Sequence, residues 1–231
     1  MQNEILWFIL LFVNFFLICG VYKLFGKLGL FMYIPIASII TNIQVVVTLD
    51  LFSMSVTLGN ITYASTFLIT DILSEYYSKK DARVAVIIGF CSIIIGTLLM
   101  YIVTFMIPDE AGAQMFENIK SIFSIQPRIV FASITTYLIS QNVDISLFKF
   151  FKDKFPSRKY LWLRNNGSTM LSQILDNVLF NFMAFLGVFP ISLIIEIVIS
   201  TYVLKFIVSL LDTPFIYFAG KIKNSKPLID V

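Results

Sequence analysis

Residues 191–219 read ISLIIEIVISTYVLKFIVSLLDTPFIYFA, and this stretch decides the class of fold. It stays apolar for longer than the roughly 20 residues that a helix needs to cross a bilayer. Three ionisable residues nevertheless lie inside it: Glu196, Lys205 and Asp212. Because a charge near the bilayer centre costs roughly 3 kcal/mol or more, such residues favour a polar pathway or binding cavity between helices. The stretch therefore predicts a membrane-spanning helix in a protein that moves or binds something polar.

The rest of the chain has the same character. Of its 231 residues, 58% are hydrophobic and 13% are charged, whereas soluble domains average about 25% charged residues. Six or seven helices fill the whole length, so no room remains for a soluble catalytic domain. We therefore predict an all-α polytopic membrane protein, a compact bundle of six to seven transmembrane helices forming a single domain. The predicted spans are residues 5–22, 28–49, 56–73, 82–107, 128–150, 168–188 and 191–219.

The lysines and arginines test this count, because cytoplasmic loops of membrane proteins are enriched in them. If seven spans alternate, all but three of the 17 basic residues fall on one side. The exceptions are Lys120 and Arg128 on the opposite side and Lys205 within a span. The pattern predicts an N-terminus outside and a cytoplasmic C-terminus. The residues on the basic side are Lys23, Lys27, Lys79, Lys80, Arg83, Lys149, Lys152, Lys154, Arg158, Lys159, Arg164, Lys221, Lys223 and Lys226.

One segment between spans is amphipathic. Within residues 109–123, apolar side chains recur at helical spacing with Glu117, Asn118 and Lys120 between them. This pattern predicts a short helix lying in the outer membrane interface. A gate over an outward-facing cavity is the alternative.

The third predicted span ends in two polar stripes. Thr66, Thr70 and Ser74 share one helical face, and Asp71 and Glu75 form a second stripe beside it. Glu75 lies near the cytoplasmic end, where a surface ion pair with a following lysine would explain it. Asp71 lies one turn deeper, so we predict a functional role for it and a coupling or gating role for Glu75.

The fifth span carries Ser140, Gln141, Asn142 and Asp144 in its cytoplasmic half. Four polar side chains so close together cannot all face lipid without a large desolvation cost. They therefore face partner helices, water or ligand. Hydrogen bonding between helices explains them as well as substrate binding does.

The sixth span is the richest in polar groups. Thr169, Gln173, Asp176 and Asn177 form one continuous polar face. Carboxylates and carboxamides together supply acceptors and donors, which suits a planar heterocycle with a mixed hydrogen-bonding edge. The preceding residues 165–168, Asn-Asn-Gly-Ser, include Asn166 and offer cap residues for a helix start.

The seventh span places Lys205 and Asp212 on one stripe, two turns or roughly 10 Å apart. That separation is too long for a direct pair. We therefore predict that Lys205 pairs with an aspartate of another helix, Asp176 or Asp71. Glu196 lies on the opposite side of the helix and is left out of the site.

The sequence also excludes several classes of site. It contains no histidine, which removes histidine-based acid–base catalysis and histidine metal sites. Walker loops, nucleophile elbows and CxxC pairs are absent. We predict that the protein is not an enzyme and needs no cofactor.

Three stretches resemble the queuosine precursor transporter family. They are LITDILSEYYSKKDAR at 68–83, WLRNNGSTMLSQILDN at 162–177 and YVLKFIVSLLDTPFIY at 202–217. Their order and spacing match the family from about residue 28 to residue 221. Ser78 departs from the pattern, because the family has glycine there, which puts a tight turn in question. The span before residue 28 is missing in some members, so we assign it no transport role.

The resemblance implies import of 7-cyano-7-deazaguanine, its aminomethyl form or queuine for tRNA modification salvage. It also implies a fold similar to the substrate-binding components of vitamin transporters, located in the bacterial inner membrane. The expected partners are this small molecule and the lipid bilayer, with no nucleic acid; proton coupling and a homo-oligomer are left open. We predict substrate-binding residues on four helices and coupling or gating residues on three. The first group is Asp71, Gln141, Asn142, Asn166, Gln173, Asp176, Asn177 and Lys205, and the second is Asp144, Asp212 and Glu75.

Two other functions compete with this one. The chain could be the substrate-binding component of an ATP-driven vitamin-type transporter, which a docking surface of small residues on the first two helices would favour. Gly20, Gly26, Gly29 and Ala37 are too sparse to decide this point. A membrane sensor or assembly protein is the second alternative.

Overall fold

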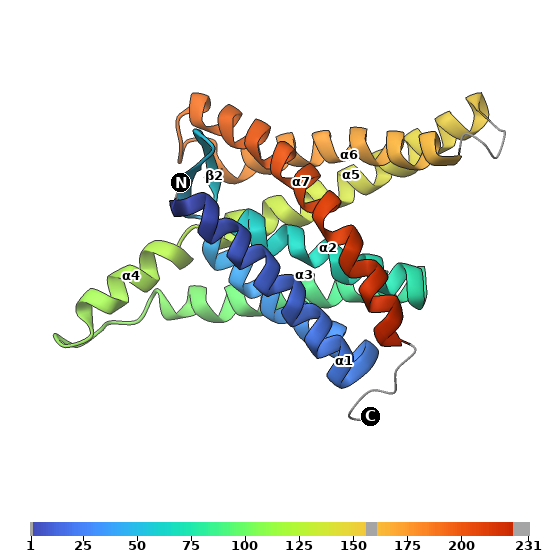
Figure 1. The fold of residues 1–231 in the computed structure, drawn as a ribbon. Helices are drawn as coiled ribbons and strands as arrows, with labels where there is room; N and C mark the ends of the chain where they lie inside the picture. Colours follow the sequence, from blue (N-terminus) through green and yellow to red (C-terminus); the bar gives the residue numbers. More distant parts are fainter. Residues whose placement is uncertain (1, 156–160, 224–231) are drawn as a thin grey trace. The chain divides into compact units, whose positions relative to one another are not determined.

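The computed structural model describes residues 2–155 and 161–223 and is helical over most of that length (Figure 1). Helices in four stretches are long and apolar enough to cross a membrane: Gln2–Gln44, Lys79–Val103, Ala113–Ser140 and Ile191–Lys223. The predicted all-α polytopic fold class is confirmed. The elements in chain order are α1 (Gln2–Gln44), β1 (Thr48–Leu51), β2 (Met54–Thr57), α2 (Gly59–Tyr76), α3 (Lys79–Val103), α4 (Ala113–Phe123), α5 (Gln126–Lys154), α6 (Leu161–Phe185) and α7 (Ile191–Lys223).

The chain divides into two compact units. Unit 1 contains α1 to α4, the β-hairpin and the part of α7 that begins at Val203. Unit 2, Arg128–Tyr202, contains nearly all of α5, the whole of α6 and the first part of α7. The prediction of a single transmembrane domain stays a prediction.

The helix α1 is a helical hairpin with two arms. Gly26 has φ 57° and ψ −139°, a conformation outside the helical region that glycine adopts readily because it has no Cβ. The arms on either side of it pack together, since the Tyr33 hydroxyl donates a hydrogen bond of 2.8 Å to Asn14 Oδ1. A helix of 43 residues measures roughly 65 Å, about twice the thickness of a bilayer core. Its two arms occupy the ranges predicted for the first two spans.

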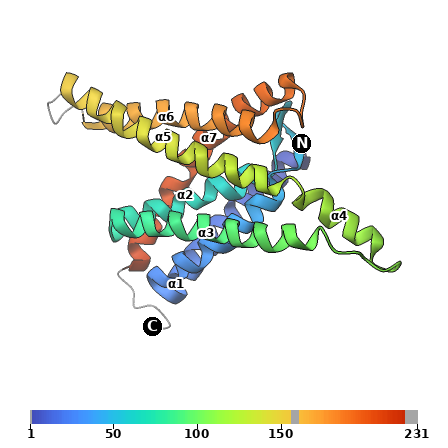
Figure 2. The same ribbon diagram turned by 180° about the vertical axis from the view of Figure 1, so that it is seen from behind.

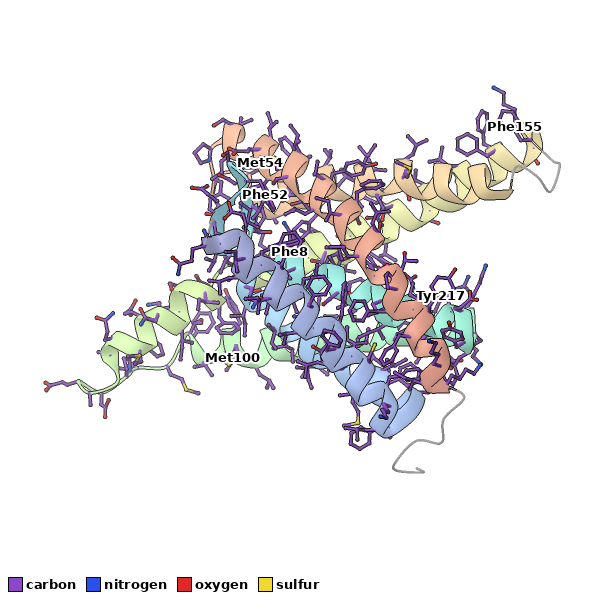
Figure 3. The ribbon with its side chains drawn as sticks, viewed as in Figure 1. Phe8, Phe52, Met54, Met100, Phe155 and Tyr217 are labelled. Carbon is purple, nitrogen blue, oxygen red and sulfur yellow. The ribbon has the colours of Figure 1, made fainter. Side chains whose placement is uncertain are left out.

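A two-stranded antiparallel hairpin, β1–β2, lies between α1 and α2. Predicted spans 28–49 and 56–73 both overlap it, so the second span ends earlier and the third begins later than predicted. The hairpin is tied to the N-terminus of α1: Asn3 Nδ2 donates to the Asp50 carbonyl at 3.1 Å, and the Phe52 amide donates to Glu4 Oε1 at 3.3 Å. Figure 3 shows Phe8, Phe52 and Met54 near one another at this end.

The core of unit 1 is built from apolar stripes on three helices. The first arm of α1 contributes Trp7, Leu11, Phe15 and Ile18, which recur at helical spacing and are at most 2% exposed. Side chains of α2 and α7 pack in the same cluster, among them Leu68, Ile69, Ile72, Leu73, Leu204 and Val208. Large apolar side chains also cover the outside, with Phe16, Leu99 and Leu210 each about 60% exposed. An exposed apolar surface of this kind is expected of a protein that faces lipid.

The turn between α2 and α3 is made without the glycine that the family pattern led us to expect. Ser78 has φ −151°, which any residue adopts, and caps α3 by accepting a hydrogen bond of 3.1 Å from the Asp81 amide. Its hydroxyl donates to the Asp81 carboxylate at 2.7 Å. Ser78 is therefore compatible with the tight turn, because it satisfies an amide at the start of the helix.

Basic residues from three parts of unit 1 gather at the end where this turn lies. Lys27, just after the bend in α1, forms an ion pair of 2.8 Å with Asp81, and its ammonium is 5.6 Å from the centre of the Tyr77 ring. Lys223, at the end of α7, lies 5.2 Å from the same ring and donates a hydrogen bond to the Tyr76 carbonyl. The bend of α1, the turn between α2 and α3 and the end of α7 thus meet at one end of unit 1.

The helix α4 occupies the segment predicted to be amphipathic. It buries Phe123 and leaves Met115 67% exposed. It follows a turn beyond the end of α3 (Figure 2). Its location in the membrane interface stays a prediction.

The helix α6 begins earlier than predicted. Residues 165–168 lie inside α6, which begins at Leu161, and therefore do not cap it. The preference of asparagine and serine for caps is a weak local tendency, and the surrounding structure overrides it. Within unit 2, α5 and α6 lie side by side in both views (Figures 1 and 2).

Candidate functional site

Contacts along its length connect α2 with α7 in unit 1. The Lys205 ammonium lies 5.4 Å from the centre of the Tyr63 ring, and the Asp71 and Asp212 carboxylates interact electrostatically. Further along, the Tyr76 hydroxyl donates 2.9 Å to the Ile216 carbonyl. The contacts follow the same order on both helices, so α2 and α7 run parallel. They bring together Asp71, Lys205 and Asp212, three of the predicted site residues.

The ionisable groups of this helix pair differ in exposure. Asp212 is 3% exposed and therefore buried, Lys205 is half-buried, and Asp71 is exposed. Pro214 follows shortly after Asp212 inside α7, and a proline removes one backbone donor from a helix. A buried acidic group, an exposed one and a cation along two parallel helices can bind a polar ligand or exchange a proton.

The hydroxyl groups on the same face of α2 are satisfied locally. Thr66 donates 2.6 Å to the Tyr63 carbonyl, and Thr70 donates 2.9 Å to the Phe67 carbonyl. Glu75 is exposed at the end of the helix. Thr66 and Thr70 therefore serve the helix backbone, whereas the side chains of Asp71 and Glu75 are exposed.

Unit 2 has its own polar cluster. Asp176 Oδ1 on α6 accepts a hydrogen bond of 3.2 Å from the Ser140 hydroxyl on α5. Both residues belong to the polar faces predicted from sequence, and the structure brings them together. Gln173, one turn before Asp176, is half-buried. The cluster thus offers a carboxylate and a carboxamide on neighbouring turns of α6.

Asn177 has a well-defined structural contact. It is 2% exposed, its Nδ2 donates 2.6 Å to the Val198 carbonyl of α7, and its Oδ1 accepts from Asn181 at 2.9 Å. The Nδ2 end of this carboxamide therefore joins α6 to α7, and the Oδ1 end is bonded within α6. Asn142 is also engaged, since its Nδ2 donates 2.7 Å to the Leu138 carbonyl of its own helix.

Some predicted residues are not described at the side-chain level. The backbones of Gln141, Asp144 and Asn166 lie in α5 and α6, and their side chains are outside the described part of the structure. Sequence reasoning in turn missed Tyr63, whose position two turns before Thr70 and Asp71 on one helical face was the available signal.

A separate polar hollow of about 590 Å³ lies at the hairpin end of unit 1, lined by Gln2, Asn3, Glu4, Asp50 and Ser53. It contains none of the predicted binding residues. Among residues 2–155 and 161–223, no three histidine, cysteine, aspartate or glutamate side chains gather as metal ligands would.

Apolar helices long enough to span a membrane, with carboxylates, an ammonium group and carboxamides among their residues, are typical of a polytopic membrane transporter. Residues 57–219 match the family model described as "Putative vitamin uptake transporter". The chain belongs to this family. The match covers most of the chain and includes all three motifs quoted above.

Two relatives have the same name. The chain is 38% identical over 221 residues to a protein of Bacillus subtilis (strain 168) named "Probable queuosine precursor transporter", covering 96% of each chain. It is 25% identical over 135 residues to a protein of that name from Haemophilus influenzae, covering 58% of this chain and 54% of the relative. The resemblance predicted from the three motifs is confirmed. No solved structure matches the chain.

Proposed function

We propose that this transporter imports 7-deazaguanine precursors of queuosine across the bacterial cytoplasmic membrane. The substrate is 7-cyano-7-deazaguanine, its aminomethyl form or queuine, taken up for tRNA modification. The observation that carries the proposal is the 38% identity with the Bacillus subtilis protein, which extends over 96% of both chains.

The polar cluster of unit 2 supports this class of substrate. A guanine-like edge presents a ring N–H beside an exocyclic amine, and a carboxylate can accept from both at once. Asp176 Oδ1 accepts a hydrogen bond from Ser140, which fixes this carboxylate one turn after Gln173 on the polar face of α6. Asp176 and Gln173 therefore bind the edge of the base in this proposal, with Gln141, Asn142 and Asn166 as further binding residues. Asn177 holds α6 against α7.

The polar face of unit 1 supplies the coupling step in the same proposal. Asp71 on α2 and Asp212 on α7 carry like charges that repel each other, and in this proposal they bind the coupling proton. Lys205 neutralises carboxylate charge and changes partners as the transporter changes state. Glu75 and Asp144 act in coupling or gating.

The gathering of Lys27 and Lys223 at one end of unit 1 supports the proposed orientation. Cytoplasmic loops are rich in lysine and arginine, so this end lies inside. The N-terminus contacts the hairpin that carries Asp50 and lies outside.

Uptake measurements test the function. Cells that lack their own importer should accumulate labelled 7-cyano-7-deazaguanine, its aminomethyl form or queuine when they express this chain. Proteoliposomes that contain only this protein should do the same. Tight binding without uptake would instead favour a substrate-binding component that needs separate ATPase subunits. Absence of binding to all three bases would overturn both transport functions and leave a sensor or assembly protein.

Asp176→Asn tests the binding site. The substitution replaces one acceptor oxygen with an N–H₂ donor that opposes the donors of the base. Hydrogen bonds to charged groups contribute about 1.5–3 kcal/mol, so binding should weaken roughly 10- to 100-fold. Glu117→Gln is the matched control, because that carboxylate is 65% exposed on α4, and its uptake should equal that of the unmodified protein. Normal uptake by the Asp176 variant would refute the assignment.

A further inference from the structure

The basic end of unit 1 carries more positive charge than its own carboxylates neutralise. It consists of residues 22–28 at the bend of α1, 73–84 around the turn between α2 and α3, and 219–223 at the end of α7. The contacts of Lys27 with Asp81 and of Lys223 with Tyr76 bring these segments together. Their acidic residues are Glu75 and Asp81, and Lys27 already pairs with Asp81. Their basic residues, all exposed except the half-buried Lys27, are Lys23, Lys27, Lys79, Lys80, Arg83, Lys221 and Lys223.

Two of these ammonium groups lie near one aromatic ring. The Lys27 ammonium is 5.6 Å and the Lys223 ammonium 5.2 Å from the centre of the Tyr77 ring. The Tyr77 hydroxyl accepts a hydrogen bond of 3.2 Å from Tyr22, which is buried in α1. An aromatic ring attracts cations through its quadrupole but carries no net charge. Tyr77 therefore holds like charges close together without neutralising them, and an anion placed beside them lowers their repulsion.

Exposed apolar side chains adjoin the basic ones. Leu24 and Leu28 follow Lys23 and Lys27 directly in the chain, and both are exposed. On α7, Tyr217 is 74% exposed one turn before the final lysines (Figure 3). A soluble anion would contact only the basic groups and leave these apolar surfaces uncovered. A ligand with an anionic head and an apolar tail matches both kinds of side chain.

We propose that the basic end of unit 1 binds the headgroup of an anionic phospholipid. Basic clusters at the ends of membrane helices attract such lipids. The phosphate lies among the ammonium groups of α1, α3 and α7, and the acyl chains lie against Leu24, Leu28 and Tyr217. Because one headgroup then contacts three segments, the bound lipid stabilises the packing of this end. The inference goes beyond the proposed function and does not depend on the transported substrate.

Lipids with brominated acyl chains test the site, since they quench a tryptophan that they touch. Leu24→Trp places an indole beside Lys23 and Lys27. In phosphatidylcholine vesicles, brominated phosphatidylglycerol should quench the added emission more than brominated phosphatidylcholine does at the same content. Ile9→Trp is the matched control, because Ile9 is exposed on the same arm of α1 and no basic residue precedes Lys23. The two lipids should quench it equally. Equal quenching of the Leu24 variant by both lipids would overturn the inference.

Removing charge tests the contribution of the basic groups. Lys23→Gln, Lys80→Gln and Lys221→Gln combined remove one charge from each segment and leave the contacts of Lys27 and Lys223 in place. On the Leu24→Trp background, the association constant for phosphatidylglycerol should fall at least about 5-fold. Lys120→Gln on α4 is the matched control and should leave it unchanged. Unchanged association in the triple variant would refute the site.

Thermal unfolding in detergent guards against a folding defect and distinguishes the source of the anion. Added phosphatidylglycerol should raise the Tm of the unmodified protein and of the Lys120 variant, and should raise that of the triple variant less. An equal rise with inorganic phosphate alone would show that a soluble anion occupies this end and would overturn the lipid assignment. Failure of deazaguanine uptake would refute the proposed function and leave this inference standing.

Discussion

Two residues at the tip of the β-hairpin have backbone conformations that side chains disfavour. Phe52 has φ 51° and Ser53 has φ 61°, and the tightest hairpin turns require positive φ at both central positions. Asparagine and glycine usually occupy these positions. A non-glycine residue in this region costs roughly 1 kcal/mol or more. The hairpin therefore stores strain at its tip, in the two residues that join β1 to β2.

Ser53→Gly should relieve part of this strain. We expect the free energy of unfolding to rise by about 1 kcal/mol, because glycine adopts positive φ without steric cost. Denaturant or thermal unfolding of the protein in detergent measures the change. Ser55→Gly is the control, since Ser55 lies within β2 and glycine weakens strand interiors. A loss of stability in the Ser53 variant equal to that of the control would contradict the strain argument.

For single residues, the sequence predicted the ionisable site residues better than the side chains that they contact. Asp71, Lys205 and Asp212 stand out because ionisable residues are rare in apolar stretches, and the structure places all three on one helix pair. Tyr63 does not stand out among 24 Phe and 10 Tyr residues. Its contact with the Lys205 ammonium joins residues far apart in the sequence.

The pairing of α2 with α7 depends on a close approach at one glycine. A Cβ atom on Gly220 would lie 2.5 Å from the Tyr76 hydroxyl oxygen, closer than packed atoms come. That hydroxyl also donates to the Ile216 carbonyl, and Lys223 lies over the same ring at 5.7 Å. The Tyr76 ring is thus held on several sides and cannot shift freely.

Gly220→Ala should therefore lower stability. Overpacking in a well-packed region costs about 1–3 kcal/mol, and the better helix propensity of alanine offsets up to about 1 kcal/mol of this. Gly20→Ala is the matched control, because a Cβ there meets nothing within 4 Å, and it should be neutral or stabilising. Thermal unfolding of both variants in detergent compares them. Equal effects would show that the Tyr76 contact does not limit packing.

The sequence predicted the helices well where an apolar stretch is long. The span at 191–219 corresponds to most of α7, and the first two predicted spans correspond to the arms of α1. The hairpin was missed because it interrupts two apolar stretches, although Ser53-Met54-Ser55-Val56-Thr57 alternates polar and apolar residues as strands do. The start of α6 was misplaced because cap residues also occur within helices.

The order of the membrane crossings is a property of the whole chain. Parallel α2 and α7 are what seven alternating spans predict, since the third and the seventh cross in the same direction. The contacts of Lys27 with Asp81 and of Lys223 with Tyr76 place three basic segments at one end. Such a concentration of positive charge is expected on the cytoplasmic side.

Single cysteines should report this arrangement in intact cells. Both native cysteines are free thiols, so Cys19→Ser with Cys91→Ser gives a background without thiols. On that background we expect a membrane-impermeant thiol reagent to label Glu117→Cys on α4 at once. Lys80→Cys should be labelled only after the membrane is permeabilised, because α3 separates the two positions by one crossing. Both side chains are exposed, so access to the reagent depends on the side of the membrane. Labelling of both positions from outside would contradict the crossing by α3. Labelling of Lys80→Cys alone would reverse the orientation and leave the order of the spans intact.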